Sequence, residues 1–155
     1  KERLRKIIPE KIDEYAIPVE QLNAIKRGSD FITPSGKVIP HEEMTEAPPR
    51  PRSYAFLTDT KVQDALIPKL QGVDMLYHDT TFTKDAEQRA AETCHATGEQ
   101  AAAFAKQAGV GRLLLGHFSA KYRDLTPLLE EAQAVLPNSA LATGGKTFQV
   151  PPETT

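Results

Sequence analysis

Polar side chains that can bind metal ions follow three consecutive predicted strands of this 155-residue chain. They are Asp59, the adjacent pair His78 and Asp79, and His117, after strands predicted over 53–57, 73–77 and 112–115. Because ligand-handling side chains collect at the carboxyl ends of strands in α/β proteins, we expect these residues to lie close together. Aspartate and histidine hold zinc or manganese, and an aspartate can bridge two ions. The pattern therefore indicates a two-metal hydrolase site.

A further histidine, His95, lies two residues before the start of the most clearly defined helix, predicted over 97–108. Near a metal site, such a histidine can donate a proton to a leaving oxygen. Each polar residue also has a structural alternative: Asp59 and Asp79 can stabilise turns, and His117 can be a hydrogen-bonded structural side chain. Repetition at equivalent strand ends favours a functional role, but the residues alone leave both interpretations open.

The elements that must position these residues begin at residue 53, where strands and helices start to alternate. Helices are predicted over 62–70, 97–108 and 126–136, and short terminal strands at Leu141 and over 147–150. Thr97 and Gln100 form a capping box at the second helix, and Thr126 is the expected N-cap of the third. The alternation predicts an α/β fold for residues 53–155.

Residues 1–52 are predicted to be an irregular segment. Seven prolines interrupt them, so long helices are not expected. The segment's local patterns predict short helices over 9–15 and 19–26, a hairpin over 30–39, and an extended, exposed stretch over 46–52. His41 is expected to be an exposed loop residue.

The overall composition limits the classes of function. One cysteine, Cys94, excludes an internal disulfide framework and fits a reducing, cytoplasmic compartment. No apolar run is long enough to span a membrane, so no membrane association is expected. A formal net charge of -2 does not support a general nucleic-acid coat, although it leaves room for a local site built with metal ions.

The combined motifs resemble the C-terminal half of ribonuclease Z, a tRNA 3′-processing endonuclease family of the metallo-β-lactamase superfamily. The segments that carry the resemblance are 53–60 (Ser-Tyr-Ala-Phe-Leu-Thr-Asp-Thr), 78–82 (His-Asp-Thr-Thr-Phe), 95–97 (His-Ala-Thr) and 116–122 (Gly-His-Phe-Ser-Ala-Lys-Tyr). They occur in the family's order and spacing. The resemblance implies the C-terminal half of an αββα sandwich, made by residues 53–155 and joined by residues 1–52 to a missing N-terminal half.

The resemblance also implies a role for each site residue. Asp59 would bridge two zinc ions and His117 would bind one of them. A zinc-bound hydroxide would attack the phosphodiester of precursor tRNA and release the 3′ trailer. His95, paired with Asp79, would be catalytic and assist the leaving 3′ oxygen, and Lys121 would contact a substrate phosphate.

Two residues depart from the family pattern. The family has glutamate where this chain has Asp79, one methylene shorter, so we expect its contact with His95 to be long or missing. The basic residue four positions after the metal histidine is commonly arginine, and here it is Lys121. A lysine can hold a phosphate as a point charge, without the bidentate fork of arginine.

The family's principal metal motif, His-x-His-x-Asp-His, is absent, since no two of the four histidines are separated by a single residue. We therefore predict a zinc-dependent endonuclease as the parent protein and an inactive 155-residue piece. Half a sandwich should expose its apolar sheet face, so a homodimer or binding of the missing half is expected. The alternatives are another metallo-β-lactamase-fold phosphodiesterase and a non-catalytic binding or assembly domain that keeps the fold.

Overall fold

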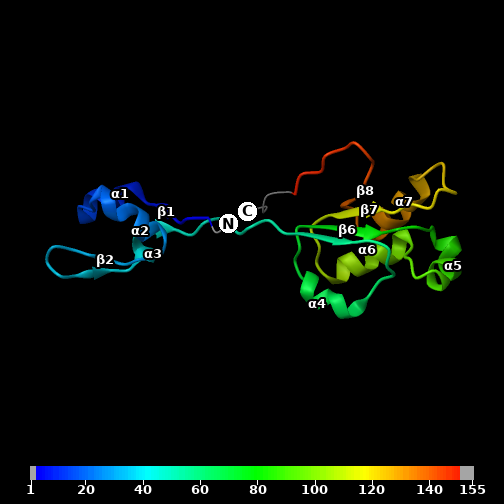
Figure 1. Ribbon diagram of the computed structural model, residues 1–155, viewed down its shortest axis with the longest axis horizontal. Helices are drawn as coiled ribbons and strands as arrows, with labels where there is room; N and C mark the ends of the chain where they lie inside the picture. Colours follow the sequence, from blue (N-terminus) through cyan, green and yellow to red (C-terminus); the bar gives the residue numbers. More distant parts are fainter. Residues whose placement is uncertain (1–2, 151–155) are drawn as a thin grey trace. The chain divides into compact units, whose positions relative to one another are not determined.

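A computed structural model describes residues 3–150 of the chain (Figure 1). The chain separates into two compact units, with the boundary between Arg50 and Pro51. The assignment of residues 1–52 as a joining segment and of 53–155 as half of a larger fold stays a prediction. Each unit is described by itself below.

The first unit consists of short elements around a small apolar core. These are β1 (Lys6–Ile7), α1 (Pro9–Tyr15), a 3-10 turn (Val19–Gln21), α2 (Leu22–Lys26), β2 (Phe31–Ile32), β3 (Val38–Ile39), α3 (His41–Met44) and β4 (Thr45–Glu46). The predicted hairpin is confirmed, since β2 and β3 pair antiparallel. The pairing of β1 with β4 was not predicted, and it brings together residues 38 and 40 positions apart. Six apolar side chains are buried here: Ile7, Ile17, Ile25, Phe31, Ile39 and Met44.

The second unit contains one parallel sheet. Its strands are β5 (Tyr54–Leu57), β6 (Met75–Asp79), β7 (Leu113–Gly116) and β8 (Ser139–Leu141), in the order β5-β6-β7-β8. All neighbouring strands run parallel, with Leu57 opposite His78 and Asp79 opposite Gly116. The carboxyl ends of β5, β6 and β7 therefore meet at one edge of the sheet, as predicted.

Four helices accompany the sheet: α4 (Ile67–Leu70), α5 (Glu87–Glu92), α6 (Gly98–Gln107) and α7 (Thr126–Val135). The helix predicted over 62–70 is shorter in the structure, because Pro68 lies in its first turn and a 3-10 turn (Asp64–Leu66) precedes it. A second 3-10 turn (Lys84–Ala86) leads into α5.

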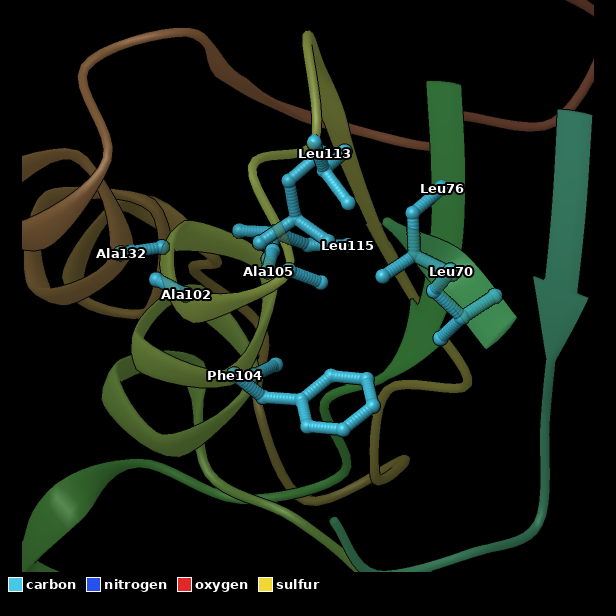
Figure 2. Packing of buried hydrophobic residues seen from close by; sticks show 11 residues of the cluster. Leu70, Leu76, Ala102, Phe104, Ala105, Leu113, Leu115 and Ala132 are labelled. Atoms are coloured by element: carbon cyan, nitrogen blue, oxygen red, sulfur yellow. The ribbon is translucent and has the colours of Figure 1, made fainter. Parts of the chain in front are cut away.

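The core of this unit lies between the sheet and α6. Leu76, Leu113 and Leu115 from the strands are fully buried and pack with Phe104 and Ala105 of α6. Figure 2 shows the leucines directed toward the helix. This packing fixes the strands whose ends carry the polar residues, since a core side chain of this size contributes about 2 kcal/mol on burial.

Two local predictions in the second unit are wrong. Thr126 is the first residue of α7 rather than its N-cap, and its amide donates to Asp124 Oδ1 at 2.9 Å. No strand forms over 147–150. Arg52 donates to the Val150 carbonyl at 2.9 Å, and the Arg112 guanidinium lies 5.7 Å from the Phe148 ring.

The capping box predicted at α6 is present. Thr97 Oγ1 accepts from the Gln100 amide at 3.2 Å, and the Gln100 side chain accepts from the Thr97 amide at 3.1 Å. We expect Thr97→Ala to lower the free energy of unfolding by about 1 kcal/mol, because the Gln100 amide loses its side-chain acceptor. Thermal and urea unfolding would measure this, and Thr93→Ala, outside the box, is the matched control. An unchanged stability would contradict the role of the cap.

The second face of the sheet carries aromatic side chains. Tyr54 and Phe56 of β5 are 52% and 56% exposed, and the Phe56 ring stacks on Tyr77 at 4.5 Å. With Met75, Leu114 and other side chains they line a groove of about 520 Å³. This face of the sheet is therefore apolar and partly exposed to solvent.

Within residues 3–150, no helix has the length and apolar character needed to cross a membrane.

Candidate active site

Asp79 lies at the centre of the candidate site. It ends β6 and its side chain is fully buried. Its Oδ2 is 2.7 Å from His95 Nδ1 and 3.1 Å from His117 Nδ1. Its Oδ1 accepts from the amide and the hydroxyl of Thr81, at 3.1 and 2.8 Å. One carboxylate oxygen therefore hydrogen-bonds His95 and lies within 3.1 Å of His117.

The expectation of a long or missing contact between Asp79 and His95 is wrong. The backbone compensates for the shorter side chain: the Ala96 amide also reaches Asp79, at 3.4 Å, and so brings the His95 loop close to β6. Burial disfavours ionisation of Asp79, but hydrogen bonds from His95, Thr81 and Ala96 outweigh it and hold the pKa of that carboxyl below its ordinary value. Asp79 is thus an ionised acceptor at neutral pH.

His117 connects Asp79 to Asp59. The His117 Nε2 lies 2.9 Å from Asp59 Oδ1, while its Nδ1 faces Asp79. Both residues have left-handed backbone, with φ of 51° at Asp59 and 60° at His117. Such conformations cost free energy and are typical of functional loops. The strand ends therefore turn sharply to aim these two side chains at each other.

The rings of His95 and His117 are stacked, with 5.1 Å between their centroids. The His95 side chain is 21% exposed, so the ring is reachable from solvent. Because Asp79 takes the Nδ1 atom, Nε2 is the atom left to meet a substrate. The structure thus brings together four of the five predicted site residues: Asp59, Asp79, His95 and His117.

Lys121, the fifth predicted residue, follows His117 on the loop after β7. Its side chain is exposed, and its Nζ lies 5.1 Å from the Phe82 ring centroid and 4.6 Å from that of Tyr122. Phe82 in turn meets the His95 ring edge-on at 6.2 Å. Lys121 is therefore linked to the histidines through one aromatic ring.

Two supporting residues were missed in the sequence. Thr81 Oγ1 lies 2.9 Å from both the Nδ1 and the carbonyl oxygen of His117. Its position two residues after Asp79 was a usable signal, because threonines after an aspartate commonly satisfy its oxygens. Tyr77 accepts a hydrogen bond from the His117 backbone, and a Cβ atom on Gly116 would overlap its hydroxyl and ring.

The donor set fits part of a metal site. Aspartate oxygen and histidine nitrogen are zinc ligands, and the second ring nitrogen of a ligating histidine usually donates to a carboxylate. Asp59 and His117 supply this pair, and Asp79 supplies the supporting carboxylate. Asp79, His95 and His117 also form a group close enough to hold an ion. Two first-sphere donors are fewer than the four that zinc takes, so the chain offers part of a coordination sphere.

His41 is not the exposed loop residue that was expected. It is the first residue of α3, its side chain is 20% exposed, and its Nδ1 lies 3.2 Å from both Asp30 Oδ1 and Glu42 Oε2. The Asp30 side chain also accepts from the His41 amide at 2.9 Å. The residue that appeared isolated in sequence thus ties the hairpin to α3 within the first unit.

His78, one residue before Asp79, is fully buried. Its Nδ1 is 2.8 Å from the Asp79 carbonyl, and its Nε2 has no partner among residues 3–150. Its ring lies 5.4 Å from Phe104, and burial lowers the pKa of the imidazole. The folded protein therefore contains this histidine in its neutral form.

A pH dependence of stability follows from His78. Because its pKa is lower in the folded state, the unfolded chain binds a proton first as the pH falls below about 6.5. We expect the free energy of unfolding to fall on acidification by up to about 1.4 kcal/mol per pH unit in that range. Urea unfolding between pH 5 and 8 would measure the slope. His78→Leu should flatten it, and an unchanged slope in this variant would contradict the assignment.

Comparisons with known proteins place this geometry in a family context. The profile of the family described as Beta-lactamase superfamily domain matches residues 47–118. The chain is 46% identical to ribonuclease Z of Bacteroides fragilis over 92% of its own length, and 44% identical to that of Parabacteroides distasonis over 93%. The resemblance to ribonuclease Z is confirmed.

Two solved structures of the metallo-β-lactamase fold superpose on this chain. The metallo-β-lactamase fold protein YhfI of Bacillus subtilis superposes with a TM-score of 0.53 and 29% identity, over 59% of this chain and 37% of that one. Human tRNase Z, short form, gives a TM-score of 0.52 and 25% identity, over 74% and 37%. The fold is that of the metallo-β-lactamase superfamily. The chain spans about half, 47%, of the length of the two ribonucleases Z.

Proposed function

We propose that this chain forms one wall of the active site of a zinc-dependent endoribonuclease that removes the 3′ trailer of precursor tRNA. One observation supports it most directly: Asp59, His117, Asp79 and His95 form a continuous chain in which each polar contact is 3.1 Å or shorter. The His95 and His117 rings also stack on each other. The 46% identity to ribonuclease Z and the likeness to human tRNase Z support the choice of substrate.

Each residue has a role in the proposed reaction. Asp59 and His117 would hold zinc, which supplies Lewis-acid stabilisation of negative charge on the phosphodiester. Thr81 Oγ1 and Asp79 Oδ2, 2.9 and 3.1 Å from His117 Nδ1, would together favour the tautomer whose Nε2 can ligate. The same carboxylate stabilises protonated His95. His95 then gives the proton on its Nε2 to the leaving 3′ oxygen, which neutralises the charge that develops there.

The remaining parts of the proposal concern the rest of the protein. A second half of the same polypeptide, N-terminal to this chain, would supply the further metal ligands and cover the aromatic sheet face of Tyr54 and Phe56. Residues 1–52 would join the two halves and residues 53–155 would form the second half of the sandwich. We propose a homodimer in the cytoplasm as the working form.

The test uses the full-length protein with a precursor tRNA that carries a 3′ trailer. We expect zinc-dependent cleavage at the base of the trailer, and no cleavage by the 155-residue chain alone. Asp59→Ala and His117→Ala should reduce bound zinc and abolish cleavage, whereas Asp64→Ala, on an exposed turn, should do neither. Cleavage by the 155-residue chain alone would refute the proposal that this chain supplies only one part of the active site. Hydrolysis of other phosphodiesters without tRNA cleavage would favour a different phosphodiesterase.

The exposed sheet face predicts association of the isolated chain. A groove of about 520 Å³ with half-exposed aromatic rings is a surface that soluble monomers rarely keep open. We expect the 155-residue chain to sediment as a dimer, and Phe56→Lys to shift it toward monomer because a buried charge is costly. Lys69→Ala, on α4, is the control. A monomer at high concentration in sedimentation velocity would refute the prediction.

A further inference from the structure

Lys121 is a cation without a carboxylate partner. Among residues 3–150 it forms no ion pair, whereas Lys84 pairs with Glu99 at 2.7 Å. Its ammonium instead lies within 5.1 Å of the Phe82 ring and 4.6 Å of the Tyr122 ring. Aromatic faces attract a cation at these distances without neutralising it. The positive charge is therefore held in place and stays available for an anion.

The two rings are themselves fixed. Phe82 is 8% exposed, and its amide and carbonyl bond to the Ala96 carbonyl and the Gly98 amide, at 3.3 and 3.2 Å. The Tyr122 hydroxyl accepts from the Thr83 amide at 3.0 Å and lies 2.7 Å from the Thr83 hydroxyl. The Phe82 backbone is thus bonded to the segment that follows His95, and the Tyr122 ring is bonded through its hydroxyl to Thr83.

We propose that Phe82 and Tyr122 are positioning residues that hold the Lys121 ammonium in place for a phosphate of the substrate. The inference rests on the proposed function for its substrate and deepens it by naming the groups that fix the phosphate contact. A flexible lysine loses side-chain entropy when it binds an anion, and the rings remove part of this loss beforehand. Two aromatic faces thus replace the rigidity that arginine would have provided.

The kinetic test measures cleavage of precursor tRNA by the full-length protein at several salt concentrations. Lys121→Ala should raise KM about ten-fold and reduce the slope of log KM against log salt by about one. Phe82→Leu and Tyr122→Leu should each raise KM about three-fold with little change in kcat. Tyr122→Phe keeps the ring but loses the hydroxyl that bonds to Thr83, so its KM should lie between those of wild type and Tyr122→Leu. Lys106→Ala, an exposed cation on α6, is the charge control.

A double-mutant comparison separates positioning from general structural damage. In the Lys121→Ala background, Phe82→Leu and Tyr122→Leu should add little, because their effect acts through the ammonium. Effects of the ring variants that persist undiminished without Lys121, or that fall on kcat alone, would overturn the inference. Circular dichroism checks folding, and if Phe82→Leu fails to fold, the Tyr122 pair of variants decides.

A second measurement does not depend on the reaction. In NMR spectra, the ε-methylene protons of Lys121 should be shifted upfield by the ring currents of Phe82 and Tyr122, and either leucine variant should reduce the shift. If the chemical shift of these Lys121 protons equals that of exposed lysines, the two rings do not enclose the ammonium, and the inference is refuted even if the enzyme is active. If the upfield shift is observed but precursor tRNA is not cleaved, the proposed function fails and the positioning of Lys121 by the two rings stands.

Discussion

Asp79→Asn is expected to lower kcat for precursor tRNA about 10³-fold, with a small change in KM. The amide has the shape of the carboxylate but no charge, so it cannot stabilise protonated His95. The amide NH2 group would also face the Nδ1 atom of His117, and two donors in contact repel each other. The substitution therefore disfavours the working orientation of the His117 ring as well. Two histidines lose their anchor through one substitution, and this explains the size of the effect.

Asp79→Glu gives the informative comparison, since it keeps the charge and lengthens the side chain. We expect Asp79→Glu to retain far more activity than Asp79→Asn if charge decides, and Asp64→Asn to behave as wild type. Single-turnover cleavage would be measured together with thermal unfolding, so that loss of folding is recognised. An Asp79→Asn enzyme within ten-fold of wild type would remove Asp79 from the proposed chemistry.

Gly116→Ala is expected to reduce kcat/KM about 100-fold and stability by about 1–3 kcal/mol. The new Cβ would overlap the Tyr77 hydroxyl and ring, so either the ring or the end of β7 must move. Because His117 is the next residue, a shift of the strand end displaces its imidazole from Asp59. Misplacement of a reacting group by about 1 Å commonly costs 100-fold in rate.

Relief of the overlap provides the control for Gly116. Tyr77→Ala removes the whole ring, so we expect the double variant Gly116→Ala/Tyr77→Ala to be more active than Gly116→Ala alone. Tyr77→Phe should not rescue, since ring carbons also collide. Activity and urea unfolding would be measured on all three variants. If the double variant is no better, the overlap is not the cause of the loss.

Local sequence signals predicted the elements that present the site. The apolar runs at 73–77 and 112–115 fixed two neighbouring strands, and the carboxyl ends of parallel strands necessarily meet at one edge. The capping box of Thr97 and Gln100 needed only residues three positions apart. Such features are encoded over a few residues, which is why they could be recognised without the fold.

Contacts between distant segments could not be predicted in the same way. The pairing of β1 with β4 joins residues 38 and 40 positions apart, through strands of two residues that have no distinct pattern. The Asp79 contact with His95 was misjudged because side-chain length alone ignores where the backbone places the two residues. The N-cap of α7 was predicted one residue too late, at Thr126 instead of Leu125, and Asp124 provides the side-chain acceptor. In each case a tertiary position outweighed a local rule.

The left-handed backbone at Asp59 and His117 sets stability against activity. A glycine at either position would adopt this conformation without the steric cost of a Cβ atom, about 1 kcal/mol per residue. Selection of variants for heat resistance alone should therefore enrich glycine at the two positions from which the proposed zinc ligands project. The residues most needed for catalysis are then among those that thermostability screens would discard first.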